Sequence, residues 1–350
     1  SIGQFLMMLK QTAESPDRKV VFYPGGKNSA VQLGSYLDMV YRRNSENNIQ
    51  FSYHWELSNK ISFSDPLSDN SNPYSGNQLS FCAETRLNNN DNTLVLNHFN
   101  YDLYDNKNQQ LSVGMKRNPA KGEYKVEGKK YNFKRKQGRV WNPGPPVRFY
   151  GFPDEVVAYH QNADFVQMLN LEHERMFSSV YYLGPLRNKA ERLYSWTGIE
   201  PESVGYSGEN TIAAILSARG KKRKIGITSK QRASYKIFEE VIAIKLKEMG
   251  LIDNFEVKPI SKNRQEYEVK VQTPGADSMV DLPDVGFGIS QVLPVLVECF
   301  YAPADSIIIM EQPEIHLHPR AQAALADVMI EAIKAKENGK DRNIQLIIET

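Results

Sequence analysis

Cysteine is scarce in this chain of 350 residues, which contains only Cys82 and Cys299. The two cysteines lie far apart, and the second lies in an apolar run, so they cannot build a disulfide framework or a four-ligand zinc site. Free thiols are typical of reducing compartments. The cysteine content therefore favours a location in the cytoplasm.

Net charge and long apolar runs are lacking as well. The 43 Lys and Arg nearly balance the 41 Asp and Glu and leave a formal charge of +2, so overall charge alone predicts no polyanionic partner. No segment reaches the roughly 18 to 20 uninterrupted apolar residues that a membrane-spanning helix needs, and we expect no membrane partner. Hydrophobic residues make up 41% and charged residues 24%, which is typical of a globular protein.

Composition divides the chain into three parts. Residues 1–43 open with SIGQFLMMLKQTAE, in which apolar residues recur at helical spacing. Residues 44–146 are rich in Asn, Ser, Tyr and Gly and contain alternating stretches that predict antiparallel strands of an accessory sheet. The Pro and Gly segment WNPGPPVRFYGFP at 141–153 marks a boundary. Residues 147–350 then return to a mixture of helices and strands, which predicts an α/β fold with a β-rich insertion.

Several shorter segments also carry secondary-structure patterns. RKVVFY at 18–23 predicts a strand, and VQLGSYLDMVYRR at 31–43 predicts a short strand, a turn at Gly34 and a short helix. In the C-terminal part we predict helix over 154–180, a buried strand in SVYYLGPLR at 179–187, an amphipathic helix over 236–250 closed by Gly250, and a strand over 266–273.

The most informative stretch is IIIMEQPEIHLHP, where the apolar run 307–310 fits a buried parallel strand and Glu311 follows at its carboxyl end. Open α/β sheets bind ligands at the carboxyl ends of their strands. A carboxylate there can hold Mg²⁺ against nucleotide phosphates, as the Walker B acid does in P-loop enzymes. We therefore predict that Glu311 is the Mg²⁺ ligand. Gln312 and Glu314 are candidates for positioning or activating the attacking water.

Two histidines follow in the same stretch. His316 and His318 alternate without a third nearby ligand, and they lack the i, i+4 spacing of the zinc-binding HExxH helix. A zinc site is therefore disfavoured here.

A glycine-rich turn precedes this stretch by about twenty residues. The segment DLPDVGFGISQ places Gly286, Gly288, Ser290 and Gln291 directly before an apolar helix that begins near Ile289. Glycines permit close backbone approach, and the free amides of a helix N-terminus suit a phosphate. These residues are candidates for nucleotide binding.

GFGISQ followed by IIIMEQPEIHLHP resembles the ABC-type ATPases of the chromosome-maintenance and overcoming-lysogenization-defect group, which includes bacterial AAA-family ATPases of phage-defence systems. The resemblance is strong over 281–350, moderate over 178–210 and loose over 1–43. It implies a P-loop NTPase fold of the ABC-type ATPase head, with ATP and Mg²⁺ as cofactors and a homodimer in the ATP state. It also implies that Gly288 and Ser290, in the signature motif, act in trans on nucleotide held by the partner's P-loop.

The same resemblance implies roles near both ends of the sequence. SIGQFLMML looks like the helix after a Walker A loop, so Ser1 lies at or just after the Mg²⁺-binding hydroxyl of that loop. NIQLIIET looks like the strand that precedes a γ-phosphate-sensing histidine. We expect the Walker A loop directly before Ser1 and this histidine directly after Thr350. Gln32 is the candidate for the Q-loop glutamine, with Gln11 as the competitor.

The subunit-contacting turn after Walker B in this family corresponds to the region of His318. Arg187 lies near the end of the strand predicted at 179–187. It either contacts nucleotide or the partner subunit, which would be a functional role, or it belongs to a structural turn.

One position departs from the common ABC pattern. The second residue after the strand is usually a catalytic Glu, whereas this chain has Gln312. Gln cannot accept a proton as a base, although it can orient water in phosphoryl transfer. Two functions therefore remain open. The first is an ATPase that couples closure of its dimer to an effector nuclease, another defence protein or nucleic acid. The second is a nucleotide-sensing interaction module with negligible hydrolysis.

Two basic segments could contact DNA or RNA. Residues 116–141 contain ten basic residues against two acids, interleaved with Tyr124, Tyr131, Phe133 and Trp141. Residues 218–232 contain seven basic residues and no acid. Such segments either follow phosphates and stack on bases or form a solvated hairpin and loop.

Overall fold

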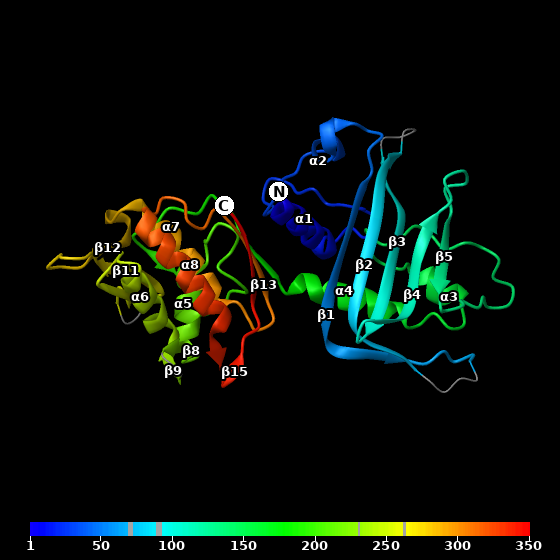
Figure 1. Cartoon of the computed structure of the whole chain (residues 1–350). Coiled ribbons are helices and arrows are strands. Elements are labelled where there is room, and N and C mark those ends of the chain that lie inside the picture. Colours follow the sequence, from blue (N-terminus) through cyan, green and yellow to red (C-terminus); the bar gives the residue numbers. More distant parts are fainter. Residues whose placement is uncertain (69–72, 89–92, 230–231, 262–263) are drawn as a thin grey trace. The chain divides into compact units, whose positions relative to one another are not determined.

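The computed structural model describes residues 1–68, 73–88, 93–229, 232–261 and 264–350 (Figure 1). It contains two compact units, residues 1–178 and residues 179–350, which are called unit 1 and unit 2 below. Residues 147–178 thus group with the preceding sheet. The division at 43 and 146 into two parts of an ATPase head and a β-rich insertion stays a prediction.

Unit 1 is built on a five-stranded antiparallel meander in the order β1-β2-β3-β4-β5. Its strands are β1 (Ile49–Phe63), β2 (Tyr74–Asn88), β3 (Thr93–Asp105), β4 (Asn108–Arg117) and β5 (Tyr124–Lys129). Every neighbouring pair is antiparallel. The antiparallel strands predicted within 44–146 are confirmed.

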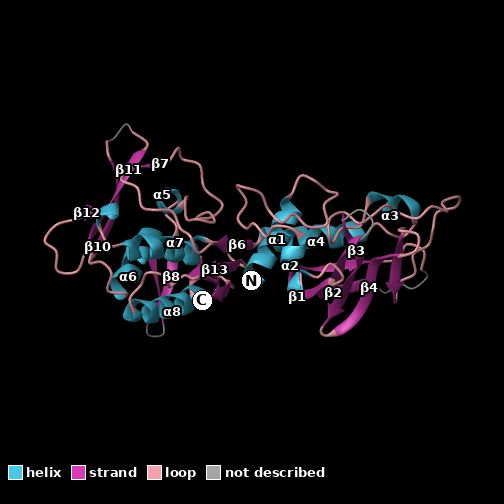
Figure 2. Cartoon of the chain, turned by 90° about the horizontal axis from the view of Figure 1, so that it is seen from above, coloured by secondary structure: helices cyan, strands magenta, loops and turns pink. Residues whose placement is uncertain are grey.

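One face of this sheet is apolar because alternate residues of each strand point to the same side. Phe81, Phe99 and Tyr101 are buried on that face. The helices α1 (Ile2–Glu14) and α4 (Val166–Ser178) lie over the sheet (Figure 2), and α3 (Asp154–Tyr159) lies near its β5 end (Figure 1). The helix predicted over 1–14 is confirmed, and the one predicted over 154–180 is split into α3 and α4.

His173 of α4 lies at the centre of unit 1 and is fully buried. The Tyr101 hydroxyl donates to the Tyr150 carbonyl oxygen at 3.1 Å, so it accepts from Nδ1 of His173 at 2.7 Å. Nε2 then accepts from the Tyr53 hydroxyl at 2.7 Å. Burial holds the pKa of His173 well below its ordinary value. The ring is therefore neutral, with both nitrogens hydrogen-bonded.

The strand predicted for 18–23 is wrong. These residues form no strand, because their backbone groups bond elsewhere. The Tyr23 N–H donates to Thr12 Oγ1 at 2.8 Å, and the Arg18 carbonyl accepts from the Arg148 N–H at 3.1 Å. The short strand predicted before Gly34 is also absent, whereas a short helix, α2 (Tyr36–Met39), follows that glycine, with a 3-10 turn at Tyr41–Arg43.

Unit 2 contains a parallel sheet in the order β16-β13-β6. Its strands are β6 (Val180–Leu183), β13 (Ile307–Glu311) and β16 (Gln345–Glu349). The central strand β13 is parallel to both neighbours, as expected for its apolar sequence. The buried parallel strand predicted at 307–310 is confirmed, and the mixed α/β class is correct.

Four helices accompany this sheet: α5 (Thr211–Gly220), α6 (Phe238–Glu248), α7 (Phe287–Tyr301) and α8 (Pro319–Lys334). α7 is buried on nearly all sides from Ile289 onward and packs against α5, α6, α8 and β13. α6 ends before Gly250, whose φ of +71° suits glycine. The helices predicted near 289 and over 236–250 are confirmed.

Two smaller sheets complete unit 2. One has the order β15-β14-β8-β9 and the other the order β10-β11-β12, with β7 paired to β11. Their strands are β7 (Tyr194–Ser195), β8 (Lys224–Ser229), β9 (Arg232–Ile237), β10 (Asn254–Pro259), β11 (Glu266–Gln272), β12 (Val280–Asp281), β14 (Lys336–Glu337) and β15 (Lys340–Asp341). The strand predicted over 266–273 is confirmed. In the part of the chain that the structure describes, no helix combines the length and apolar character needed to cross a bilayer.

Candidate functional site

Glu311 ends the central strand β13 and is buried, with 5% of its surface exposed. The hydroxyl of Tyr182, on the neighbouring strand β6, donates to Glu311 Oε1 at 3.0 Å. Burial raises the pKa of Tyr182, and the Glu311 carboxylate raises it further, so the phenol stays protonated and keeps donating. The Glu311 side chain is thus oriented at the carboxyl end of the sheet.

Glu349 is a second carboxylate at the same sheet edge. It pairs in register with Glu311, because β16 and β13 are parallel and end together. Its side chain is exposed, and its charge also raises the pKa of Tyr182. Neither Tyr182 nor Glu349 was predicted from the sequence. A polar residue at the end of each predicted strand is the signal that could have identified them.

Arg187 holds the backbone that leaves β13. Its guanidinium donates to the Glu311 carbonyl oxygen at 2.9 Å and, from both terminal nitrogens, to the Gln312 carbonyl oxygen at 3.3 Å. Burial lowers the pKa of Arg187 to about 10, while the nearby Glu314 carboxylate acts in the opposite direction. Arg187 therefore stays charged at neutral pH and fixes the turn after the strand.

Gln312 has a strained backbone with φ of +45°, a region that non-glycine residues rarely occupy. Its N–H donates to the Glu349 carbonyl oxygen at 2.6 Å, while its own carbonyl accepts from Arg187. Bonds to both neighbouring segments thus maintain the strain. The Gln312 side chain is exposed at the sheet edge, where it can meet a ligand.

Glu314 is half-buried, and its Oε2 atom has no hydrogen-bond partner among the described residues. The same holds for Nε of Arg187 and Nε2 of Gln291. Buried polar atoms without partners are rare in folded proteins and need an explanation such as a functional role. Three of them belong to residues that the sequence motifs singled out.

The glycine-rich turn lies against the segment that follows β13. Gly286 is the N-cap of α7, and a Cβ on Gly288 would lie 2.9 Å from the His316 carbonyl oxygen. The Phe287 ring meets the His316 ring edge-on at 4.9 Å. Gly288 is therefore required for this close approach, which brings the two motifs together within one chain.

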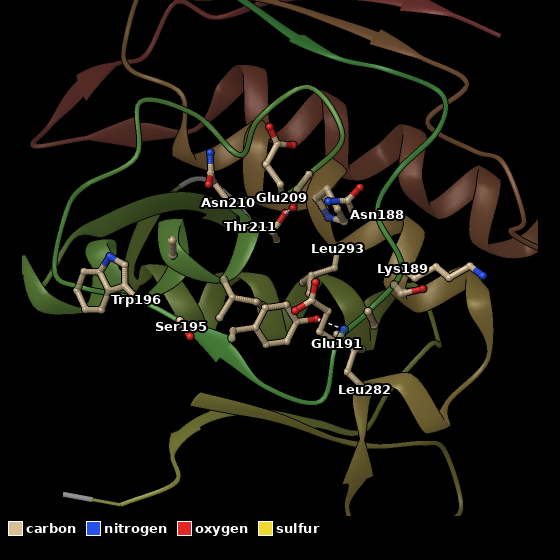
Figure 3. Close-up of a pocket in the computed structure, with 17 residues that line it drawn as sticks. Asn188, Lys189, Glu191, Ser195, Trp196, Glu209, Asn210, Thr211, Leu282 and Leu293 are labelled. Carbon is tan, nitrogen blue, oxygen red and sulfur yellow. Dashed lines mark hydrogen bonds between the residues drawn. The ribbon is translucent and has the colours of Figure 1, made fainter. Parts of the chain in front are cut away.

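Ser290 lies in the first turn of α7, where its hydroxyl donates to the Phe287 carbonyl oxygen at 2.8 Å. It also lines a cavity of about 210 Å³, whose polar wall includes Asn188, Glu191 and Glu209 (Figure 3). The next residue, Gln291, is buried. Ser290 thus faces a polar cavity beside the helix N-terminus.

His318 is the N-cap of α8. Its Nδ1 accepts from the Ala321 N–H at 3.3 Å, which places the proton of the neutral ring on Nε2. The side chain is exposed. This local role explains a histidine before Pro319, and a role in subunit contact stays a prediction.

The remaining candidates belong to unit 1. Ser1 is the N-cap of α1, where its hydroxyl oxygen accepts from the Gln4 N–H at 3.1 Å. Gln11 is buried and bonds to both backbone groups of Val31. Gln32 is exposed and donates to the Lys27 carbonyl oxygen. It does not lie on a strand as predicted, and the nucleotide-binding roles of these residues stay predictions.

Comparisons with known proteins bear on the C-terminal part of the chain. A search of curated proteins found no match. Residues 200–350 match the family model described as AAA ATPase domain. This range contains the glycine-rich turn, Glu311 and the segment that follows it. The match supports an AAA-type ATPase family, and with it a P-loop nucleotide hydrolase that uses ATP and typically Mg²⁺.

Proposed function

We propose that this chain belongs to the ABC-type ATPases of the chromosome-maintenance and overcoming-lysogenization-defect group, with a β-rich insertion in the ATPase head. The observation that carries the proposal is the carboxyl end of β13. Glu311 is oriented there by Tyr182, and the turn that follows is held by Arg187. Nucleotides bind at this edge of open α/β sheets.

The residues at this edge fit a nucleotide with Mg²⁺. Magnesium is usually held by one or two carboxylates together with phosphate oxygens and water. Glu311 supplies such a carboxylate, and within the described ranges no group of three or more His, Cys, Asp or Glu side chains could hold a metal alone. When bound, Mg²⁺ neutralises charge on the phosphates. The unpartnered atoms of Arg187, Gln291 and Glu314 are consistent with a polar ligand.

Gln312 and Glu314 share the handling of the attacking water in this proposal. The exposed Gln312 amide orients the water, since it cannot take a proton. The Glu314 carboxylate, with one oxygen unpartnered in the described structure, is the base. Arg187 keeps the turn that carries both residues in place.

We further propose that two copies close around ATP, with Gly288 and Ser290 of one copy acting on nucleotide held by the other. The N-terminus of α7 supplies free amides for an anion. Ser290→Arg should leave ATP binding to the monomer intact and prevent ATP-dependent dimerisation, which light scattering with and without ATP measures. Loss of binding by the monomer would count against action in trans.

Closure of the dimer would then act on a partner. This partner is an effector nuclease, another defence protein of an antiphage system, or nucleic acid. A nucleotide-sensing module is the second candidate, and Gln312 in place of a catalytic Glu favours it. Gln312→Glu distinguishes the two. A large gain in turnover favours the sensor, whereas little change favours Glu314 as the working carboxylate.

The direct test of hydrolysis is Glu311→Gln in the full-length protein. We expect Mg²⁺-dependent ATP turnover to fall by at least about 100-fold, the loss typical of removing an electrostatic catalytic group. Asp327→Asn is the matched control, because Asp327 is exposed on α8 and the substitution removes the same charge. Unchanged turnover in Glu311→Gln would overturn the assignment.

A further inference from the structure

Residues 116–141 carry ten Lys and Arg against two Glu, and this charge is not neutralised within the protein. None of the ten basic residues forms an ion pair within the described ranges. The hydrogen bonds of Lys130, Arg135 and Lys136 go to carbonyl oxygens or an amide. A net charge of +8, from ten minus two, remains on this segment.

The second basic segment, residues 218–232, behaves differently. Arg219 pairs with Glu239, Lys221 with Glu200, and Arg223 with Glu337. These three cations thus connect elements of unit 2, whereas Lys222 and Lys224 form no ion pair within the described ranges. Of the two segments with the same compositional signal, 116–141 is the one in which none of the basic residues is paired within the described ranges, so all ten are left for an external anion.

The register of β4 and β5 places like charges opposite each other, and a bound anion would reduce their repulsion. Lys116 on β4 lies directly opposite Lys125 on β5. Like charges directly opposite one another destabilise a sheet. β5 is an edge strand, so Lys125 and Lys129 on it are exposed. An anion bound over these strands would relieve the repulsion.

A cavity of about 490 Å³ lies beside β5. Lys121, Lys125 and Arg135 line it together with the aromatic rings of Phe133 and His160. The carboxylate of Glu123, which also lines it, accepts a hydrogen bond from Asn142 at 2.9 Å. The cavity therefore combines three cations with ring surfaces, the two features that nucleic-acid grooves use.

An exposed tryptophan follows the cavity. Trp141 is 58% exposed, and its ring lies 6.5 Å from the Tyr159 ring. The Arg139 guanidinium lies 5.9 Å from the Trp141 ring and 6.0 Å from the Tyr159 ring. Such a platform can stack on an unpaired base, whereas the bases of a duplex already stack on one another.

We propose that residues 116–141 form a binding surface for single-stranded nucleic acid, with Lys116, Lys121 and Lys125 contacting the phosphates and Trp141 stacking on a base. The inference is independent of ATP hydrolysis, because binding at this surface needs no nucleotide. Charged edge strands also prevent sheets from associating edge to edge. A test must therefore separate binding from solubility.

The test is fluorescence anisotropy of a labelled oligothymidine of about 20 nucleotides, long enough for one such groove, with the full-length protein and no ATP. We expect binding that weakens steeply between about 50 and 200 mM salt. Lys121→Glu with Lys125→Glu should weaken binding at least about tenfold and reduce the salt dependence. Trp141→Ala should weaken it about tenfold with the salt dependence unchanged.

The matched control is Lys222→Glu with Lys224→Glu, which makes the same charge change in the second basic segment. We expect the affinity of this control variant for the oligonucleotide to stay within about twofold of the wild-type affinity. The remaining difference would come from long-range electrostatics. The proposal is wrong if the wild type does not bind the oligonucleotide, or if the Lys121 and Lys125 variant binds equally well. It is also wrong if that variant only aggregates while keeping its affinity, since the lysines would then protect the edge strand. Equal affinity for a duplex would overturn the single-strand preference.

Discussion

Two buried polar groups of side chains, one around His173 in unit 1 and one at the end of β13 in unit 2, differ in how their atoms are hydrogen-bonded. In unit 1, both ring nitrogens of His173 are hydrogen-bonded to tyrosine hydroxyls, and the ring stacks on Tyr150 at 4.3 Å. In unit 2, the polar side chains around the end of β13 leave atoms of Arg187 and Glu314 without partners in the described structure. A satisfied polar network specifies a fold. An unsatisfied one at a strand end indicates a binding site.

The largest effect that this comparison predicts is on stability, at His173. His173→Leu should lower the free energy of unfolding of unit 1 by about 3 kcal/mol, because the Tyr53 hydroxyl loses its acceptor and Tyr101 loses a donor. Urea unfolding followed by tryptophan fluorescence measures this, since Trp55 lies 5.5 Å from the His173 ring. His54→Leu, at an exposed position of β1, is the control. Equal effects of the two substitutions would contradict the structural role of His173.

The two units should also respond to pH in opposite directions. Burial lowers the pKa of His173, so the unfolded state takes up a proton that the folded state does not, and unit 1 loses stability as pH falls below about 6.5. Burial raises the pKa of Glu298 on α7 to about 7. Its folded carboxyl group is protonated first as pH falls, so unit 2 gains stability between about pH 7 and 4.5.

Each change is at most about 1.4 kcal/mol per pH unit for one group. Unfolding of Trp196→Phe reports on unit 1 through Trp55 and Trp141, and a variant that keeps only Trp196 reports on unit 2. We expect the unit 1 midpoint to fall and the unit 2 midpoint to rise between pH 7.5 and about 5.5. His173→Leu and Glu298→Gln should each flatten the corresponding change. If the two midpoints shift in the same direction with pH, groups other than His173 and Glu298 determine the pH dependence of stability.

The smallest expected effect on stability lies at Glu314. Glu314→Gln should change the free energy of unfolding by less than about 1 kcal/mol, since it removes the charge of a carboxylate whose Oε2 is unpartnered in the described ranges. ATP turnover should nevertheless fall on the order of 100-fold if this carboxylate is the base. Thermal unfolding and turnover of one preparation measure both. A large loss of stability with normal turnover would make Glu314 a structural residue.

Local patterns allowed much of unit 2 to be predicted. The strand at 307–310, the helix near 289 and the helix over 236–250 follow from periodicity within a few residues. The contacts that orient Glu311 could not be predicted in this way. Tyr182 is 129 residues away in the sequence, and only the parallel pairing of β6 with β13 places its hydroxyl beside Glu311.

The errors in unit 1 have a related cause. Residues 18–23 have a strand-like composition, yet Thr12 and Arg148 provide hydrogen-bond partners for their backbone from outside any sheet. Gln32 follows Val31, whose backbone is bonded by the Gln11 side chain in place of a strand. Side-chain bonds between distant segments replaced the ladder that composition predicted.

We propose that Glu311 holds Mg²⁺ beside ATP at the end of β13, and the affinity for ATP with and without Mg²⁺ tests this role. Calorimetry on the full-length wild type should show that Mg²⁺ raises ATP affinity about tenfold or more, which is about 1.4 kcal/mol. In Glu311→Gln this gain should disappear while the metal-free affinity is unchanged. An equal gain from Mg²⁺ in both proteins would show that Glu311 is not the Mg²⁺ ligand.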